Sequence, residues 1–393
     1  MILQCLRSKE KHSGRQEIIA GALWALDEDR RKAIYDKLRA EGTEKEEIDF
    51  LLLSPYRAST WKLVDQLSAM ARSRYWMEVT PQYVYDSPEE NNESIRRLIK
   101  VKRPRAAFES LDFALEEIPT SLLAQLLSAM AGQTQDKDRE HRLDSYHVRH
   151  AFQLLDRNSD LSLEEKAGLE FAYLEILAIP YQGDRDYQIP NLERYIEKHP
   201  ELFVQAVVWA YKRDDPGEDP VELRPKDGCE HLAQRGWRLL DAMERIPGQD
   251  KATKEEQQVA LGEWVIKVRQ SCAELGREEI ADVCLGKLLA KAPKGDDGVW
   301  PNEAVREVME ELKSENMSIG ACTSLYNARG PYWRREGGDQ ERELANKYRV
   351  WAEALQFTHP FVSTSVLGAT VRTYEREAEQ HDTEASIGRR LRQ

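Results

Sequence analysis

Hydrophobic residues recur every three or four positions through most of the chain, the spacing that places them on one face of an α-helix. The pattern is clearest in the segment that Ser162 opens, where Glu165 follows three residues later and completes a capping box. The apolar stripe of this segment is formed by Ala167, Phe171, Leu174 and Ala178. The pattern therefore predicts a helix that begins after Ser162 and ends before Pro180.

Proline residues mark the starts of several such segments. Pro104 and Pro119 each open an apolar run, and Pro360 opens another after an amphipathic stretch that ends at Leu355. Proline fits the first turn of a helix, where its missing N–H costs no hydrogen bond. The chain therefore repeats a unit of helix, tight turn and helix, which is densest at 104–131, 162–211 and 344–378.

Signals for β-strands are almost absent. The best candidate runs from Trp76 to Tyr85, and Pro81 interrupts it. The pentapeptide LSAMA occurs at 67–71 and at 127–131, which hints at a duplication, but no repeat of fixed period is present. We predict an all-α fold with little or no β-structure, built as an irregular α-solenoid or as stacked helical hairpins of the tetratricopeptide or HEAT type.

Three polar stretches rich in turn-forming residues suggest boundaries, at 132–140, 213–228 and 246–256. They predict an N-terminal helical domain over 1–135, a middle domain of helical hairpins over 141–248, and a C-terminal helical domain over 255–393. The middle stretch is equally consistent with a long loop inside a domain.

Composition narrows the class of protein. The chain has 393 residues, of which 41% are hydrophobic and 32% charged, and its net charge is -13. Such a charge argues against a surface that binds nucleic acid or anionic membrane over its whole extent. The five cysteines are odd in number and show no CxxC spacing, as expected for free thiols in a reducing compartment. No apolar run is long enough for a membrane helix. We expect a cytoplasmic protein.

Motifs for catalysis and cofactors are absent from the sequence. The nearest approach to a P-loop is Gly286-Lys287, which lacks the upstream glycine and the following hydroxyl residue, so we interpret it as helix interior. The GxGxxG, GxSxG and HExxH motifs do not occur. We predict no cofactor, no catalytic residue and no enzymatic activity. A site assembled from residues that are distant in sequence remains an alternative.

Two groups of residues resemble metal ligands, and we favour an ordinary structural role for both. His141, Asp144, His147 and His150 are spaced to share part of a helix face, but structural zinc sites normally use two ligand pairs. Asp214-Asp215 and Asp296-Asp297 lack the ligand spacing of an EF-hand, and acidic pairs beside proline or glycine are typical of solvated turns. We therefore predict no metal site.

A basic stretch at 96–105 stands out in this acidic chain. It could contact phosphates, but it also fits a helix whose cationic last turn complements the helix dipole. A nucleic-acid interface here would use Arg96, Arg97, Lys100, Lys102, Arg103 and Arg105.

The segment 326–343, which we call the Arg/Trp loop, interrupts the helical pattern. Arginine and aromatic residues are enriched at binding hot spots, so this loop is a candidate protein-binding surface. A structural loop, whose tryptophan fills a seam and whose arginines pair with Glu336, Glu341 or Glu343, is an equally good interpretation. The candidate partner-binding residues are Tyr326, Arg329, Tyr332, Trp333, Arg334 and Arg335.

The segments 298–312 (GVWPNEAVREVMEEL), 327–355 and 371–386 resemble the C-terminal helical regions of large, mostly uncharacterised bacterial proteins. LEFAYLEIL followed by HPELFVQAVVWAYK is similar to the same regions. Some of these large proteins carry a separate N-terminal effector or NTPase module and occur with mobile-element or phage-defence genes. The resemblance implies a bacterial helical scaffold and no particular reaction.

Together these observations favour a non-enzymatic helical-repeat module that binds a protein partner and acts as a regulatory part of a bacterial defence or mobile-element system. The alternatives are a nucleic-acid-binding accessory protein that uses 96–105, and an enzyme with a site between helices. The sequence gives no indication of oligomeric state.

Overall fold

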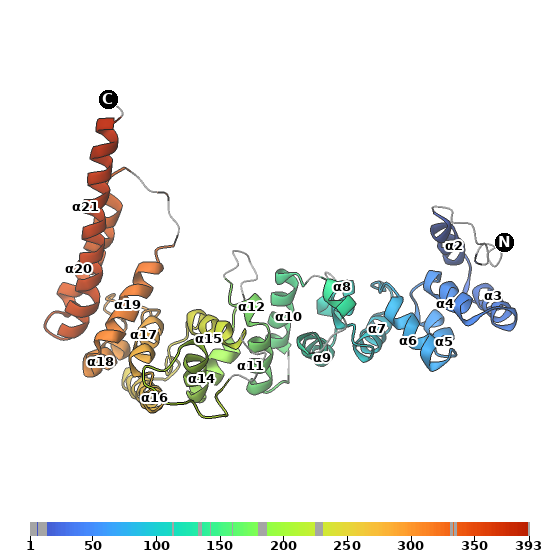
Figure 1. Cartoon of the computed structure of the whole chain (residues 1–393), viewed down its shortest axis with the longest axis horizontal. Coiled ribbons are helices and arrows are strands. Elements are labelled where there is room, and N and C mark those ends of the chain that lie inside the picture. Colours follow the sequence, from blue (N-terminus) through green and yellow to red (C-terminus); the bar gives the residue numbers. More distant parts are fainter. Residues whose placement is uncertain are drawn as a thin grey trace. The chain divides into compact units, whose positions relative to one another are not determined.

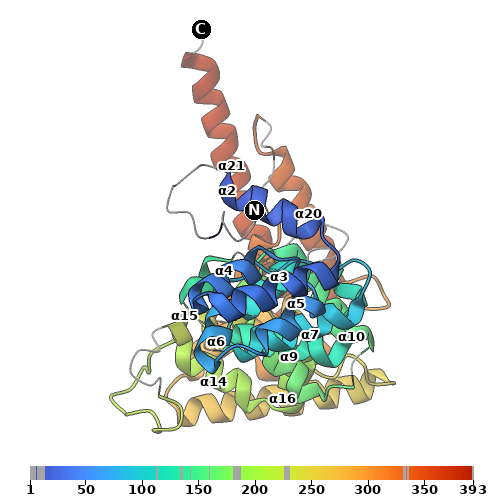
Figure 2. The same ribbon diagram turned by 90° about the vertical axis from the view of Figure 1, so that its right-hand side faces the viewer.

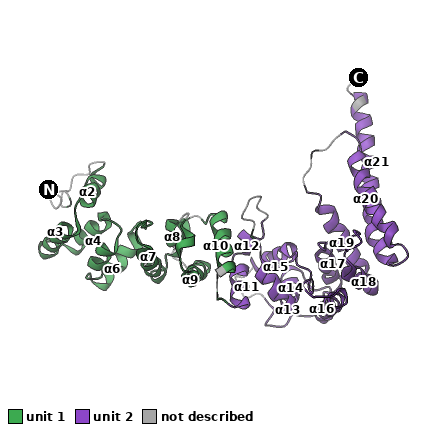
Figure 3. Cartoon of the chain, turned by 180° about the vertical axis from the view of Figure 1, so that it is seen from behind, with its two compact units in different colours: residues 1–161, 181–187 green, residues 162–180, 188–393 purple. Residues whose placement is uncertain are grey.

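The computed structural model confirms the all-α fold. It describes residues 6, 14–111, 114–132, 136–141, 143–158, 160–179, 187–224, 231–330, 333 and 336–391, and no strand occurs among them (Figure 1). The chain divides into two compact units, one formed by 1–161 with 181–187 and the other by 162–180 with 188–393 (Figure 3). The division into three domains at 135–141 and 248–255, and the solenoid arrangement, stay predictions.

Unit 1 is built from short helices joined by tight turns. Its elements are α2 (Arg15–Trp24), α3 (Glu28–Glu41), α4 (Glu44–Leu53), α5 (Ala58–Val64), α6 (Ala69–Glu78), α7 (Pro88–Lys100), α8 (Pro104–Leu111), η1 (Leu115–Glu117), α9 (Thr120–Ala131), η2 (Asp136–Glu140) and α10 (Ser145–Asn158). Pro104 is the first residue of α8 and Pro119 immediately precedes α9, as the sequence predicts.

Aromatic side chains form the core of the first half of unit 1. Trp61 and Trp76 are almost completely buried, with ring centroids 5.8 Å apart. Tyr56 packs edge-on against Trp61 at 5.0 Å, and its hydroxyl lies 2.5 Å from that of Ser94. Edge-to-face packing of this kind adds to the burial of apolar area. The core therefore fixes α5, α6 and α7 and the segment between α4 and α5.

The candidate strand at 76–85 does not form. Trp76 lies in α6, which ends at Glu78, and the following residues run to α7 without pairing to any described strand. The two copies of LSAMA take different places in their helices. The first copy spans the start of α6, with Ser68 as its N-cap, whereas the second copy ends α9.

Unit 2 contains longer helices. Its elements are α11 (Leu163–Ala172), α12 (Leu174–Leu177), α13 (Pro190–Lys198), α14 (Glu201–Ala210), α15 (His231–Ala242), α16 (Lys254–Glu274), α17 (Glu278–Leu289), α18 (Glu303–Leu312), α19 (Glu315–Asn327), α20 (Asp339–Leu355), the π-helical η3 (Val362–Leu367) and α21 (Gly368–Leu391). The capping box at Ser162 and Glu165 is present at the start of α11. In Figure 2, α16 is seen along most of its length, and it packs against α14, α17 and α18.

Two glycines allow α17 and α19 to pack closely. A Cβ atom on Gly286 of α17 would lie 2.0 Å from the carbonyl oxygen of Met317. A Cβ atom on Gly320 of α19 would lie 2.0 Å from the carbonyl oxygen of Val283. The backbone of each helix thus occupies the space that a Cβ atom on the glycine of the other helix would need. Gly286 is buried inside α17, which confirms the interpretation of Gly286-Lys287 as helix interior.

Carboxylates from one element repeatedly cap the N-terminus of another. Glu170 of α11 accepts the backbone N–H of Leu192 at 2.7 Å at the start of α13. Asp138 accepts the N–H groups of Arg105 and Ala106 at 3.0 Å each at the start of α8. Glu170 and Asp138 are completely buried. A carboxylate at this place satisfies free N–H groups and complements the helix dipole. These buried acids therefore have a structural role.

Candidate functional site

Unit 1 contains a groove that encloses about 680 Å³, within the range of about 300 to 1,000 Å³ that is usual for ligand sites. The corner between α2 and α3, the start of α5 and the connection between α6 and α7 surround it. The lining residues are Trp24, Glu28, Arg31, Pro55, Tyr56, Arg57, Ala58, Ser59, Lys62, Gln82, Tyr83, Val84, Tyr85, Asp86 and Glu90. We call this site the aromatic groove.

The α2–α3 corner positions Trp24. Helix α2 ends at Trp24, and Asp27 caps α3 by accepting the N–H of Arg30 at 2.8 Å. The Arg31 guanidinium donates hydrogen bonds to the carbonyl oxygens of Leu23, in the last turn of α2, and of Leu26, in the turn that follows. The turn is therefore held from both sides, and Trp24 remains 53% exposed at the rim.

The connection between α6 and α7 presents two tyrosines. Its Val84 is buried, and the Asn91 side chain holds it by accepting the N–H of Val84 at 2.8 Å and donating to its carbonyl oxygen at 2.9 Å. The rings of Tyr83 and Tyr85 lie edge to face with centroids 5.0 Å apart, and Tyr85 is 90% exposed. The Tyr83 hydroxyl donates to Glu117, while burial and this carboxylate raise the pKa of Tyr83 to about 12.

An ion-pair cluster joins this connection to α5. Arg57 lies 2.8 Å from Asp86 and 3.1 Å from Glu90. Glu90 also accepts the N–H of Ala58 at 2.8 Å and so caps α5. Because one cation faces two acids, this wall of the aromatic groove keeps a net negative charge.

Helices α3 and α5 bring further cations to the site. Arg31 and Lys62 line the aromatic groove and, together with Lys32, an adjoining hollow of about 170 Å³. The two cavities share Glu28, Arg31, Ser59 and Lys62. Within the described part of the chain, none of the three cations forms an ion pair. The site therefore combines exposed aromatic rings with positive charge, which suits the binding of rings together with anionic groups.

The structure separates the candidate residues of the Arg/Trp loop. Tyr326 belongs to α19, where its hydroxyl donates to Glu377, and Trp333 is 95% exposed. Arg329 pairs at 2.8 Å with Glu341, which is completely buried, and lies 5.9 Å from the ring centroid of Tyr374. Tyr332, Arg334 and Arg335 lie outside the described residues. Arg329 thus pairs as the structural interpretation expects, and the binding role of the loop stays a prediction.

Half of the basic stretch takes part in packing. Arg97 pairs with Asp65 at 2.7 Å and with Glu93 at 2.6 Å. Arg103 is buried and donates to the carbonyl oxygens of Trp76 and Val79 at 2.8 Å each. Arg105 is partly buried, and its guanidinium donates to a backbone carbonyl oxygen. The exposed cations of the stretch are Arg96, Lys100 and Lys102. A nucleic-acid interface here stays a prediction that rests on these three.

The histidine cluster is distributed over separate contacts. His141 pairs with Glu109, and His150 lies 3.2 Å from Glu116. Asp144 caps α10 by accepting the N–H of Tyr146 at 2.8 Å. No group of three or more potential metal ligands occurs among the described residues.

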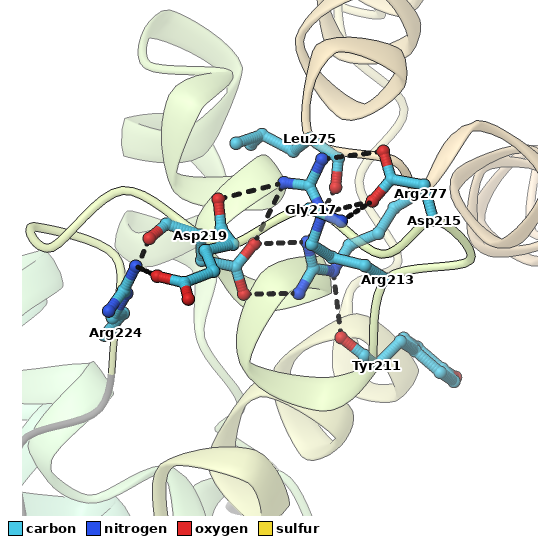
Figure 4. Close-up of polar contacts among 9 residues, drawn as sticks. Tyr211, Arg213, Asp215, Gly217, Asp219, Arg224, Leu275 and Arg277 are labelled. Carbon is cyan, nitrogen blue, oxygen red and sulfur yellow. Dashed lines mark hydrogen bonds and ion pairs between the residues drawn. The ribbon is translucent and has the colours of Figure 1, made fainter.

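Asp215, of the acidic pair at 214–215, is part of a network that anchors its loop (Figure 4). Asp215 pairs with Arg213 at 2.5 Å, and the Arg213 guanidinium lowers the pKa of Asp215 to about 2. Arg277, which is 2% exposed, holds Asp219 through two hydrogen bonds of 2.6 and 2.7 Å and donates to the carbonyl oxygen of Tyr211 at 2.9 Å.

Gly276 brings Arg277 to this loop. Its φ of 62° closes a Schellman motif, in which the N–H of Arg277 bonds to the carbonyl oxygen of Cys272 at 2.8 Å. A Cβ atom on Gly276 would lie 2.7 Å from the Asp215 carboxyl carbon. Glycine is therefore favoured here by its conformation, and a Cβ atom would also displace the Asp215 carboxylate. The second acidic pair is held in a similar way, since Asp297 lies 2.7 Å from Arg306.

The cysteines within the described residues are free thiols. Burial raises the pKa of Cys272 to about 12 and that of Cys284 to about 11. Cys5 and Cys229 lie outside the described residues.

The aromatic groove escaped prediction from sequence because its residues come from several helices and connections between 24 and 90. One signal was present: Tyr83 and Tyr85 alternate with Val84, a pattern that we interpreted as part of a strand. The absence of a partner strand nearby would have indicated an extended connection with one face exposed.

No described helix has the length and apolar character needed to cross a membrane. Comparison with known proteins finds no matching family model, no matching curated protein and no matching solved structure.

Proposed function

We propose that this chain is a non-enzymatic helical module that binds a protein partner, and that the aromatic groove of unit 1 is the docking site. The observation that carries the proposal is the exposure of Tyr85 and Trp24, at 90% and 53%, on a concave surface whose backbone is fixed by buried contacts. Aromatic side chains dominate binding energies at protein interfaces, and they do so best where little ordering is needed.

Rigidity supports this interpretation. Tyr85 follows a buried valine that two hydrogen bonds from Asn91 hold in place, and Trp24 precedes a capped turn. Because the backbone on both sides is already ordered, a partner would lose little of its binding energy to the ordering of this surface. A groove lined in this way is better suited to a peptide segment than a flat patch would be.

The setting of the module is part of the same proposal. The resemblance of 298–312, 327–355 and 371–386 to C-terminal regions of large bacterial proteins supports a regulatory role in a bacterial defence or mobile-element system. The buried free thiols at Cys272 and Cys284 support a reducing compartment such as the cytoplasm.

Site-specific cross-linking tests the proposal. A photoreactive benzoylphenylalanine replaces Tyr85 in the full chain, which is expressed in its native host. Phe357 provides a matched control, because it is aromatic and 89% exposed but belongs to unit 2. We expect one protein to be cross-linked at position 85 and not at 357. Equal labelling of many proteins at both positions would contradict the proposal.

A further inference from the structure

We infer that the aromatic groove recognises an extended acidic segment of its partner, one in which carboxylate side chains lie next to proline or aromatic residues. The inference rests on the proposed function and adds the chemistry of the ligand. It is carried by the uneven distribution of charge and aromatic rings along the groove and its adjoining hollow.

The charges in the adjoining hollow are mainly positive, whereas Arg57, Asp86 and Glu90 in the larger cavity leave one acid without a matching cation. Arg31, Lys32 and Lys62 have no acidic partner among the described residues, and Glu28 is the acid that lines the hollow with them. The whole chain carries a net charge of -13, so the hollow has the opposite sign to the chain as a whole. A ligand with carboxylates would be favoured here, and basic ligands would be repelled.

The exposed tyrosines line the larger cavity, and the cations extend from that cavity into the hollow. Tyr83 and Tyr85 line the larger cavity, whereas Lys32 lines the adjoining hollow, and Arg31 and Lys62 line both. A ligand that follows this surface would meet aromatic rings first and cations next. Proline and aromatic side chains stack well on exposed tyrosine and tryptophan, as in grooves that bind proline-rich peptides. The expected segment therefore has its rings at one end and its carboxylates at the other.

An acidic peptide fits this arrangement better than single-stranded nucleic acid. A nucleic-acid strand carries a negative charge at every nucleotide and usually follows a continuous positive track. Glu28, Asp86 and Glu90 line the same surface and would repel part of such a strand. A peptide can place its carboxylates beside Lys32 and Lys62 and leave neutral residues next to the acids.

A positional-scanning library of ten-residue peptides, presented to the full chain, tests the inference. We expect the selected peptides to be enriched in Asp and Glu beside Pro, Trp or Tyr. The best peptide is then titrated by fluorescence anisotropy against three variants. The variant Lys32→Glu/Lys62→Glu reverses the charge of the hollow. Lys37→Glu reverses an exposed lysine of α3 that does not line the site. Tyr85→Ala removes the ring.

We expect the double charge reversal to weaken binding at least tenfold and to reduce its dependence on salt, because charges screened at the surface act mainly at low ionic strength. Lys37→Glu should change the affinity less than twofold. Each variant is first shown to keep the circular dichroism spectrum and thermal midpoint of the wild type, so that a loss of binding cannot be a loss of fold.

The outcomes separate the inference from the proposed function. The docking site stands if Tyr85→Ala abolishes the binding of the selected peptides. The acidic specificity is nevertheless wrong if those peptides are neutral or basic, or if the charge reversal leaves their affinity unchanged. If no peptide depends on Tyr85, both are wrong. A labelled oligouridine of about twelve nucleotides tests the nucleic-acid alternative. If it binds, competes with the peptide and no longer binds after the charge reversal, the ligand is single-stranded nucleic acid and not an acidic peptide.

Discussion

Replacing Gly286 by alanine tests the packing of unit 2 most severely. The new Cβ atom would lie 2.0 Å from the carbonyl oxygen of Met317 and 2.8 Å from its carbonyl carbon. An acceptable distance between carbon and oxygen is about 3.3 Å, so α17 and α19 would have to separate by about 1.3 Å. The atoms in contact belong to the backbone of a helix, so no flexible side chain can move aside.

The expected loss of stability follows from two opposing effects. Overpacking of a close interface costs about 1 to 3 kcal/mol, and a gap of about 1 Å elsewhere along the crossing loses up to about half of the dispersion energy there. Alanine gains about 1 kcal/mol over glycine inside a helix. Because the atoms in contact belong to two backbones, we expect the overpacking to cost more than about 3 kcal/mol. After the gain in helix propensity, the net loss of stability for Gly286→Ala is then about 2 to 4 kcal/mol.

Gly168 provides the matched control. It also lies inside a helix, α11, but a Cβ atom there would meet nothing within 4 Å. Gly168→Ala should therefore stabilise the protein by about 0.5 to 1 kcal/mol. Urea unfolding followed by circular dichroism, with hydrogen exchange of 278–289 as a local measure, gives both values. A Gly286→Ala protein as stable as Gly168→Ala would refute the close crossing of α17 and α19.

Three further predictions concern ion pairs and thiols. The Arg306 guanidinium lowers the pKa of Asp297 to about 2, so the pair stabilises the fold above the unfolded pKa of about 4 and loses its effect as the pH falls towards 2. The difference in thermal midpoint between the wild type and Asp297→Asn should therefore close over that range, and a constant difference would contradict it. Arg103→Gln should cost about 2 kcal/mol in urea unfolding because it leaves two buried carbonyl oxygens without their donor, whereas Arg96→Gln should change stability by less than about 0.5 kcal/mol. The thiol of Cys272 should resist iodoacetamide at pH 8 until the protein unfolds, as mass spectrometry of labelled peptides would show.

The sequence predicted the helices well because their signals are local. Ser162 and Glu165 form the expected capping box, and Gly276, which follows α16, has the left-handed conformation that glycine adopts readily. The periodic apolar residues Leu261, Trp264 and Val265 are buried as their spacing indicates. Each of these features depends on residues within a few positions of one another.

The contacts that connect distant segments were beyond prediction. Arg277 pairs with Asp219 across 58 residues, and Arg103 fills a place among the carbonyl oxygens that end α6. The sequence groups Arg103 with the other cations of 96–105, because the order of residues in a basic stretch does not show which side chain is buried. The aromatic groove could not be predicted for the same reason, because Trp24 and Tyr85 line one cavity only after unit 1 has folded.

The central claim is tested most directly by measuring how tightly a partner binds variants of Tyr85 and Phe357, two aromatic residues that are about equally exposed. The partner segment recovered by cross-linking, or the best selected peptide, is titrated calorimetrically against the wild type, Tyr85→Ala and Phe357→Ala. A hot-spot aromatic contributes about 2 kcal/mol or more, which corresponds to about a thirtyfold change in affinity. We predict that loss for Tyr85→Ala and a change below twofold for Phe357→Ala. Equal affinities for all three proteins would contradict a docking site in the aromatic groove.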